Sequence, residues 1–155
     1  MIRLTTSLAP AILILAACAP MEGAPPTGGS WGDAPALDSG AYEIRDVATL
    51  GLTGAEMLPE SAAAVQARLG STEPVEGRYA ETLNAYENPP KGAVVFTMTD
   101  LPDDSVSAEQ HVVEFDLRPD AQVEGRVFAM PTGYGVRHKC ARAADPDVWT
   151  TSLCP

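Results

Sequence analysis

Hydrophobic and polar residues alternate along much of the second half of the chain. In residues 93–101, Val94, Phe96 and Met98 occupy every second position. In residues 107–117, one set of alternate positions holds His111, Val113, Phe115 and Leu117, and the other holds Gln110, Val112, Glu114 and Asp116. A period of two is typical of a strand whose two faces lie in different environments. Both segments are predicted to be β-strands.

Two more strands are predicted at residues 124–130 and 136–141. Residues 131–135, with the sequence Pro-Thr-Gly-Tyr-Gly, are expected to form a hairpin loop between them. The last strand carries Val136, His138 and Cys140 on one face and Arg137 and Lys139 on the other. Because the connections between these strands are short, the sheet is predicted to be an antiparallel meander.

One segment of the first half has the spacing of an amphipathic helix. Its apolar stripe is formed by Leu58, Ala62, Val65 and Leu69. Pro59 suits the first turn of a helix and Gly70 suits the position after its end, so a helix is predicted over residues 59–69.

Residues 79–86 fit two interpretations. Tyr79, Leu83 and Tyr86 have a spacing that suits a helix, but the turn at residues 88–92 leads directly into a strong strand. A hairpin across this turn favours a strand over a helix.

The chain begins with the pattern of a signal peptide. Its apolar run, residues 8–17, is too short to span a bilayer, because a spanning helix needs about 20 apolar residues. Leu15-Ala16-Ala17-Cys18 resembles the lipobox of bacterial lipoproteins. The resemblance implies that residues 1–17 are removed and that Cys18 is acylated. It also implies that Ala19 directs the protein to the outer membrane, facing the periplasm. An ordinary secretory signal that ends in a cysteine is the alternative.

A stretch without periodicity follows. Residues 18–40 are rich in Pro and Gly and are interpreted as a flexible tether. Residues 41–155 have the length of a single domain. The predicted fold class is α+β, with a small N-terminal helical region packed on an antiparallel sheet of four or five strands.

The cysteine content indicates one disulfide. Of the three cysteines, Cys18 is assigned to the lipid, which leaves Cys140 and Cys154. Disulfides form in exported proteins, and two cysteines allow one pairing. The alternative is a zinc or thiol-catalytic site, but only His138 is near and no Cys-x-x-Cys motif is present. A bridge between Cys140 and Cys154 is therefore predicted to staple the C-terminal tail.

The C-terminal half also resembles a known group of proteins. Leu-Pro-Asp-Asp-Ser-Val at residues 101–106, the strand around residues 111–115, Cys140, Trp149 and the closing Cys-Pro are similar to a group of small secreted bacterial proteins of unknown function. The resemblance covers about residues 79–155. It implies an exported domain with a C-terminal disulfide and carries no known activity.

The chain is acidic, with a formal net charge of −11. That balance argues against a nucleic-acid partner, because such a protein must neutralise phosphates with Lys and Arg. Four cations nevertheless occur near the C-terminus: Arg126, Arg137, Lys139 and Arg142. They form a candidate site for an anion or an acidic partner surface, and a solvated charged face is the alternative.

Few residues suggest catalysis. His111 and His138 fall in the inward register of two strands, where a pair could act as a base or bind a metal; two hydrogen-bonded histidines are the alternative. Asp100, Asp103 and Asp104 cluster in a sequence typical of a turn, although calcium also takes such oxygen ligands. No catalytic residue, metal site or cofactor is assigned from the sequence.

A non-enzymatic binding or accessory role in the cell envelope is the function that these features favour. The expected partners are the lipid bilayer, through acylated Cys18, and an envelope protein. The alternative is a small-ligand carrier or a hydrolytic enzyme with a pocket near His111 and His138. Whether the protein is an enzyme stays open, although the lack of a catalytic constellation favours binding.

Overall fold

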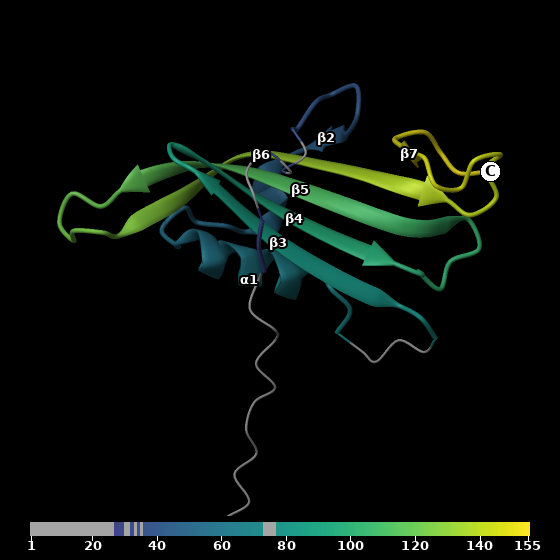
Figure 1. Cartoon of the computed structure of the whole chain (residues 1–155), viewed down its shortest axis with the longest axis horizontal. Coiled ribbons are helices and arrows are strands. Elements are labelled where there is room, and N and C mark those ends of the chain that lie inside the picture. The colour runs from purple at the N-terminus through teal and green to yellow at the C-terminus, as the bar shows by residue number, and fades with distance from the viewer. Residues whose placement is uncertain (1–26, 30–31, 33, 35, 73–76) are drawn as a thin grey trace, which may run out of the picture.

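One α-helix packs on a twisted antiparallel sheet in the computed structural model, which describes residues 27–29, 32, 34, 36–72 and 77–155. The four long strands are β3 (Ala80–Asn88), β4 (Lys91–Thr99), β5 (Val106–Pro119) and β6 (Val127–Cys140). Two short strands, β2 (Glu43–Arg45) and β7 (Trp149–Thr150), pair with β6, and β1 (Thr27–Gly29) pairs in parallel with β3. Figure 1 shows α1 (Leu58–Leu69) against one face of the sheet.

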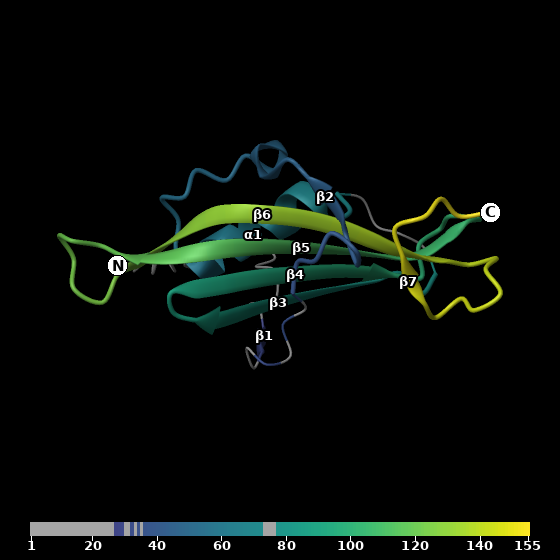
Figure 2. The same cartoon turned by 90° about the horizontal axis from the view of Figure 1, so that it is seen from above.

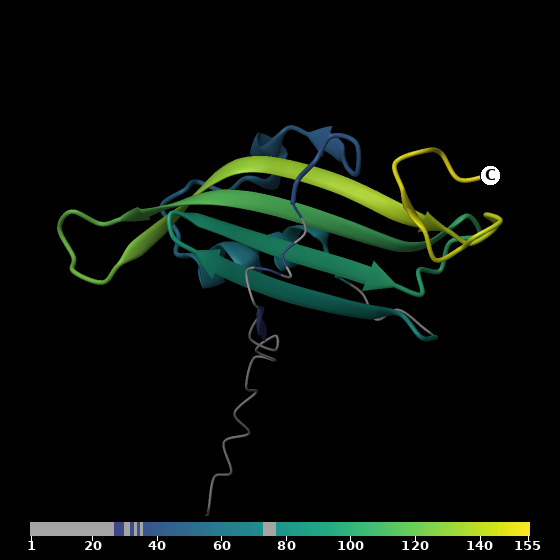
Figure 3. The same ribbon diagram turned by 45° about the horizontal axis from the view of Figure 1, so that its top comes forward.

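The alternation in the sequence corresponds to the two faces of this sheet. On the face beneath α1, the buried side chains from β4 and β5 are Val94, Phe96, Met98, Val113, Phe115 and Leu117. Val95 and Val112 belong to a smaller core on the opposite face. We call these the helix face and the strap face. In Figure 3 the four long strands lie side by side in front of α1.

The predicted antiparallel sheet with a helix packed on it is confirmed, and the predicted helical region is present in part. The strands predicted at residues 93–101 and 107–117 are present as β4 and β5, and residues 80–86 lie in β3. Among the described residues, the helical region includes α1 and the 3-10 turn Val47–Leu50. The sheet exceeds the predicted four or five strands because short β1, β2 and β7 extend it. Strands of two or three residues are too short to show an alternating pattern.

The predicted hairpin loop at residues 131–135 is wrong. β6 runs through this segment without a break, and the turn between β5 and β6 lies before residue 127. Pro131 has no N–H to donate, but it pairs with Phe115 beside a shift in the β5–β6 register, and such an irregularity tolerates a proline.

α1 begins and ends where its sequence predicts. Pro59 occupies its first turn, and the Glu60 carboxylate accepts a hydrogen bond from the Met57 N–H at 2.9 Å. The predicted apolar stripe faces the sheet, with Ala62 and Val65 fully buried. At the other end, Glu81 of β3 accepts a hydrogen bond from the Ser71 N–H at 2.8 Å and so holds the helix end to the sheet.

The strap face is covered by residues 36–42, which we call the strap. Leu37 lies over β6, where a Cβ at Gly135 would clash with its Cδ1 atom, and one at Gly133 would be 2.7 Å from its Cδ2 atom. The two glycines therefore leave the space that Leu37 fills. Tyr42 is 1% exposed and completes this cover. Part of the segment predicted as tether thus packs on the sheet.

The predicted Cys140–Cys154 disulfide is present, with a Cα–Cα distance of 5.3 Å. It joins the end of β6 to the C-terminal tail that follows β7, which pairs with β6. Figure 2 shows β7 and the C-terminus at the same end of the molecule. The predicted signal peptide and lipidated Cys18 lie outside the described residues. Within the described part of the chain, neither helix has the length and apolar character of a transmembrane span.

Candidate functional site

An open pocket of about 400 Å³ lies beside the turn between β4 and β5. Its lining residues are Met98, Leu101, Pro102, Asp103, Val106 and Glu109, and α1 contributes none of them. Met98 and Glu109 are direct neighbours across β4 and β5, and both lie in the alternating positions of the helix face. We call this the Glu109 pocket.

Glu109 is connected to two buried polar side chains. Its Oε1 atom lies 2.7 Å from Nε2 of His111, and Nδ1 of His111 lies 2.8 Å from the Tyr134 hydroxyl. His111 and Tyr134 are each 4% exposed, whereas the Glu109 side chain is 35% exposed. The carboxylate favours the tautomer with the proton on Nε2, so the neutral ring accepts a hydrogen bond from Tyr134 at Nδ1. We call these three residues the open network, because one end reaches the pocket.

The contact between His111 and Glu109 is close but poorly aligned. His111 Nε2 has no hydrogen-bond partner of good geometry among the described residues, although Oε1 lies within ion-pair distance. The contact nevertheless favours the charged form of the carboxylate. It holds the pKa of the Glu109 carboxyl below its usual value, and the charge of Arg45 on β2 acts in the same direction against burial. Burial raises the pKa of the Tyr134 phenol. At neutral pH the pocket therefore presents an ionised Glu109.

The aspartates of the β4–β5 turn stabilise the turn itself. Asp100 has a positive φ of 51°, a backbone conformation that Asp tolerates better than most residues. Asp103 Oδ1 accepts hydrogen bonds from the Ser105 and Val106 N–H groups at 2.7 Å, which lower the pKa of this carboxyl. Asp104 pairs with Arg142 at 3.2 Å. Of the two interpretations of this sequence, a turn or a calcium site, the contacts of Asp103 and Asp104 fit the turn.

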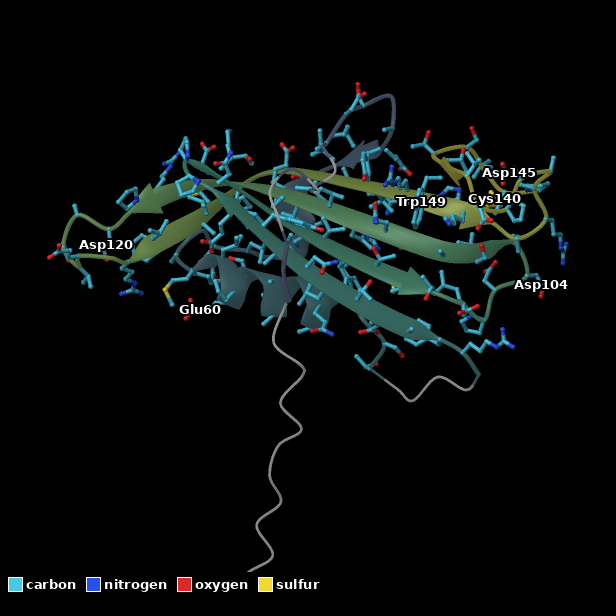
Figure 4. All side chains as sticks on the ribbon, in the orientation of Figure 1. Glu60, Asp104, Asp120, Cys140, Asp145 and Trp149 are labelled. Atoms are coloured by element: carbon cyan, nitrogen blue, oxygen red, sulfur yellow. A yellow bond between two sulfur atoms is a disulfide. The ribbon has the colours of Figure 1, made fainter. Side chains whose placement is uncertain are left out.

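The four predicted cations do not form one patch. Arg126 lies just before β6 and contacts the Phe128 ring at 4.8 Å, whereas the other three lie near the far end of that strand. The separation along β6 is on the order of 30 Å at the rise of a strand. Figure 4 shows the same distinction, with Asp120 at one end of the molecule and Asp104, Cys140 and Trp149 at the other.

Each of the other three cations has partners within the chain. The Arg137 guanidinium lies 4.5 Å from the Tyr42 ring centre and 5.0 Å from that of Trp149. Lys139 Nζ lies 3.5 Å from Asp147 Oδ1, and Arg142 pairs with Asp104. Arg137 is thus held between two rings and helps to fasten the strap.

Gln110 completes a second polar network, on the strap face. Its Oε1 atom accepts hydrogen bonds from the Tyr42 hydroxyl at 3.0 Å and from Arg137 Nε at 2.9 Å. Its Nε2 group donates to Thr97 Oγ1 at 3.0 Å. We call Tyr42, Thr97, Gln110 and Arg137 the closed network, because its members bond to one another and none lines either pocket described here.

The two histidines serve different partners. His111 belongs to the open network, whereas Nε2 of His138 forms a hydrogen bond with the backbone oxygen of Ser152 at 2.7 Å. His138, Cys140 and Cys154 bring possible metal-ligating atoms within 4.8 Å of one another. The two sulfurs are joined in the disulfide, however, and the thiolate is the form that ligates metals.

A second pocket, of about 250 Å³, lies at the other end of the helix face. Its lining includes Met57, Leu58 and Pro59 at the start of α1, with Glu87, Leu117 and Val127 from the strands. Glu87 is exposed and forms no part of the open network. This pocket is smaller and lacks a half-buried charge.

Sequence reasoning singled out His111 but missed Glu109 and Tyr134. Glu109 stands two positions before His111, so the period of two already placed the two side chains on one face. Tyr134 was assigned to a hairpin loop, and that error hid its position in β6. Comparison with family models, with curated proteins and with solved structures found no match for this chain.

Proposed function

We propose that this protein is a small-ligand-binding domain held at the cell envelope by lipidated Cys18, and that the Glu109 pocket is its binding site. The observation that carries the proposal is a half-buried, ionised carboxylate in an otherwise largely apolar pocket. Apolar walls with a few placed polar groups are typical of small-molecule sites, and a volume of about 400 Å³ lies in their usual range.

Binding is favoured over catalysis by the positions of the reactive groups. The pocket lining contains two carboxylates but no histidine, serine or cysteine. His111 lies behind Glu109 and is 4% exposed, so a ligand in the pocket meets the carboxylate first. One observation favours the alternative of a hydrolytic enzyme, namely the line of contacts from Tyr134 through His111 to Glu109. It needs the pocket to open as far as His111.

A blocking variant tests the binding site. Val106 lines the pocket, and Val106→Trp fills it with a larger side chain. Val123→Trp is the matched control, because Val123 is 49% exposed and lines neither pocket. A library with equal numbers of cationic, neutral and anionic small molecules is screened against each purified protein by thermal shift. Ligands that stabilise the wild type and the Val123→Trp protein, but not the Val106→Trp protein, are expected. If the library stabilises none of the proteins, the proposed function fails.

The envelope anchor is a separate part of the proposal and has its own test. The intact mass of the protein from membranes should equal that of a chain that begins at Cys18 and carries several acyl chains. Several chains together anchor more stably than one chain. A Cys18→Ala variant that keeps its export signal should leave the membrane fraction. An unmodified Cys18 in the native protein would remove the anchor and leave the ligand site unaffected.

A further inference from the structure

The polar groups of the Glu109 pocket all carry the same sign of charge. Two of its six lining residues are carboxylates, Glu109 and Asp103, and none is a lysine or arginine. Both carboxyls have pKa values lowered by their contacts, the first by His111 and the second by backbone N–H groups. The pocket is therefore anionic at neutral pH, while Met98, Leu101, Pro102 and Val106 give it apolar walls.

Glu109 keeps binding capacity for a ligand. Its Oε1 atom faces His111, and the Glu109 side chain forms no other hydrogen bond or ion pair with the described part of the chain. Arg45 on β2, whose charge helps to lower the Glu109 pKa, is itself paired with Glu43 at 3.1 Å. A ligand that covers the pocket removes water from Glu109, and this is unfavourable unless the ligand supplies a positive charge or a hydrogen-bond donor.

We infer that the ligand of the Glu109 pocket is a small organic cation, a protonated amine with an apolar body, whose ammonium group binds the Glu109 carboxylate. This inference rests on the proposed function and specifies its ligand class. The apolar body packs against the four apolar lining residues, and His111 and Tyr134 position the carboxylate from behind.

Other ligand classes fit the pocket less well. An anion meets two negative charges. A hard cation such as Ca²⁺ takes six to eight oxygen ligands, but Oδ1 of Asp103 already accepts two backbone hydrogen bonds and four of the six lining residues are apolar. A neutral apolar molecule removes water from the Glu109 carboxylate and supplies no hydrogen-bond donor or charge in its place.

Three probes with the same ring separate these classes: benzylamine, benzyl alcohol and benzoate. Binding of each to the purified protein is measured by calorimetry at pH 7. Benzylamine is expected to bind about tenfold or more tightly than benzyl alcohol, because its ammonium group adds the attraction of opposite charges to the hydrogen bond that either probe can donate to the carboxylate. Benzoate is expected not to bind.

Two variants test whether Glu109 causes the preference for benzylamine over benzyl alcohol. Glu109→Gln removes the charge inside the pocket and should reduce the benzylamine affinity to that of benzyl alcohol. Asp104→Asn removes one charge from the adjacent turn without touching the pocket, and should keep the preference. If Glu109→Gln does not fold, the three probes on the wild type still decide.

The outcomes separate the inference from the proposed function. If benzyl alcohol or benzoate binds at the pocket as tightly as benzylamine or more tightly, the inference of an organic cation is wrong, and the pocket remains a small-ligand site. An amine preference that survives in folded Glu109→Gln overturns the role of Glu109. Absence of binding by all three probes and by the whole library removes both proposals.

Discussion

The two faces of the sheet each carry a polar network, and the networks differ in where they end. On the strap face, Gln110 bonds to Tyr42, Arg137 and Thr97, so its amide is satisfied inside the protein. On the helix face, the network that begins at Tyr134 ends at Glu109 in the pocket. The two networks differ in the element that covers them. The strap and Trp149 cover one, whereas α1 contributes nothing to the lining of the pocket at the end of the other. The closed network therefore stabilises the fold, and the open network is available for binding.

The largest expected effect comes from removing the disulfide, which holds the tail that follows Trp149. Replacing Cys140 and Cys154 by serine should lower the free energy of unfolding by about 3 kcal/mol, because the unfolded chain loses the restraint of a loop of this length. Urea unfolding of oxidised wild type and the double variant measures the difference. Ligand binding at the Glu109 pocket should persist below the unfolding transition. A double variant with the same free energy of unfolding as the wild type would contradict the stabilising role assigned to the disulfide.

Arg137→Ala should have the next largest effect, because it breaks the closed network at its centre. The variant loses a hydrogen bond to Gln110 and ring contacts with Tyr42 and Trp149, which together are worth about 2 kcal/mol. Urea unfolding measures the loss, and calorimetry with benzylamine should show no change in affinity. An Arg137→Ala protein that keeps its stability but loses benzylamine binding would reverse the assignment of the two networks.

Gly135→Ala should displace the strap without unfolding the sheet. The new Cβ would clash with Leu37 Cδ1 and would lie 2.9 Å from Tyr42 Cβ, and such overpacking costs about 1 kcal/mol or more. Hydrogen exchange should become faster at the Leu37 N–H, which donates to Glu114 at 3.1 Å, while α1 stays protected. Gly40→Ala is the control inside the strap, because its Cβ would make only ordinary contacts. Equal exchange in both variants would show that the strap does not need the space above Gly135.

The smallest expected effect is a pH dependence caused by Glu109. Its pKa in the folded protein lies below the usual value, mainly because of His111, so ionised Glu109 stabilises the folded state. This contribution is fully present above about pH 4.5 and is lost as the pH falls through the folded pKa. The stability difference between wild type and Glu109→Gln should therefore be largest at pH 7 and shrink towards pH 3. A difference that grows on acidification would have the wrong sign for a lowered pKa.

The periodic parts of the fold could be predicted from the sequence, and the aperiodic cover could not. The alternation around His111 and the stripe around Val65 repeat over enough residues to identify β5 and α1. The strap has no repeat, since Leu37 is placed by the space above two glycines far along the chain. The same glycines, together with Pro131, suggested a loop where β6 continues, because turn-forming residues are also used at strand irregularities.

The candidate site shows the same division. The face shared by Glu109 and His111 follows from their spacing, but the contact with Tyr134 depends on the β5–β6 register. The pocket depends on the path of the β4–β5 turn, which supplies three of its lining residues. The disulfide could be predicted from the number of cysteines alone. The four cations clustered in sequence, yet the length of β6 separates Arg126 from the others.

Methionine methyl NMR during a benzylamine titration tests the Glu109 pocket most directly. Met98 lines this pocket and Met57 lines the smaller pocket at the opposite end, so the protein supplies its own control. If benzylamine binds in the Glu109 pocket, the Met98 methyl signal shifts saturably and the Met57 signal stays unchanged. An unchanged Met98 signal at the highest benzylamine concentration, or a saturable shift of Met57 alone, would contradict the assignment of the ligand site.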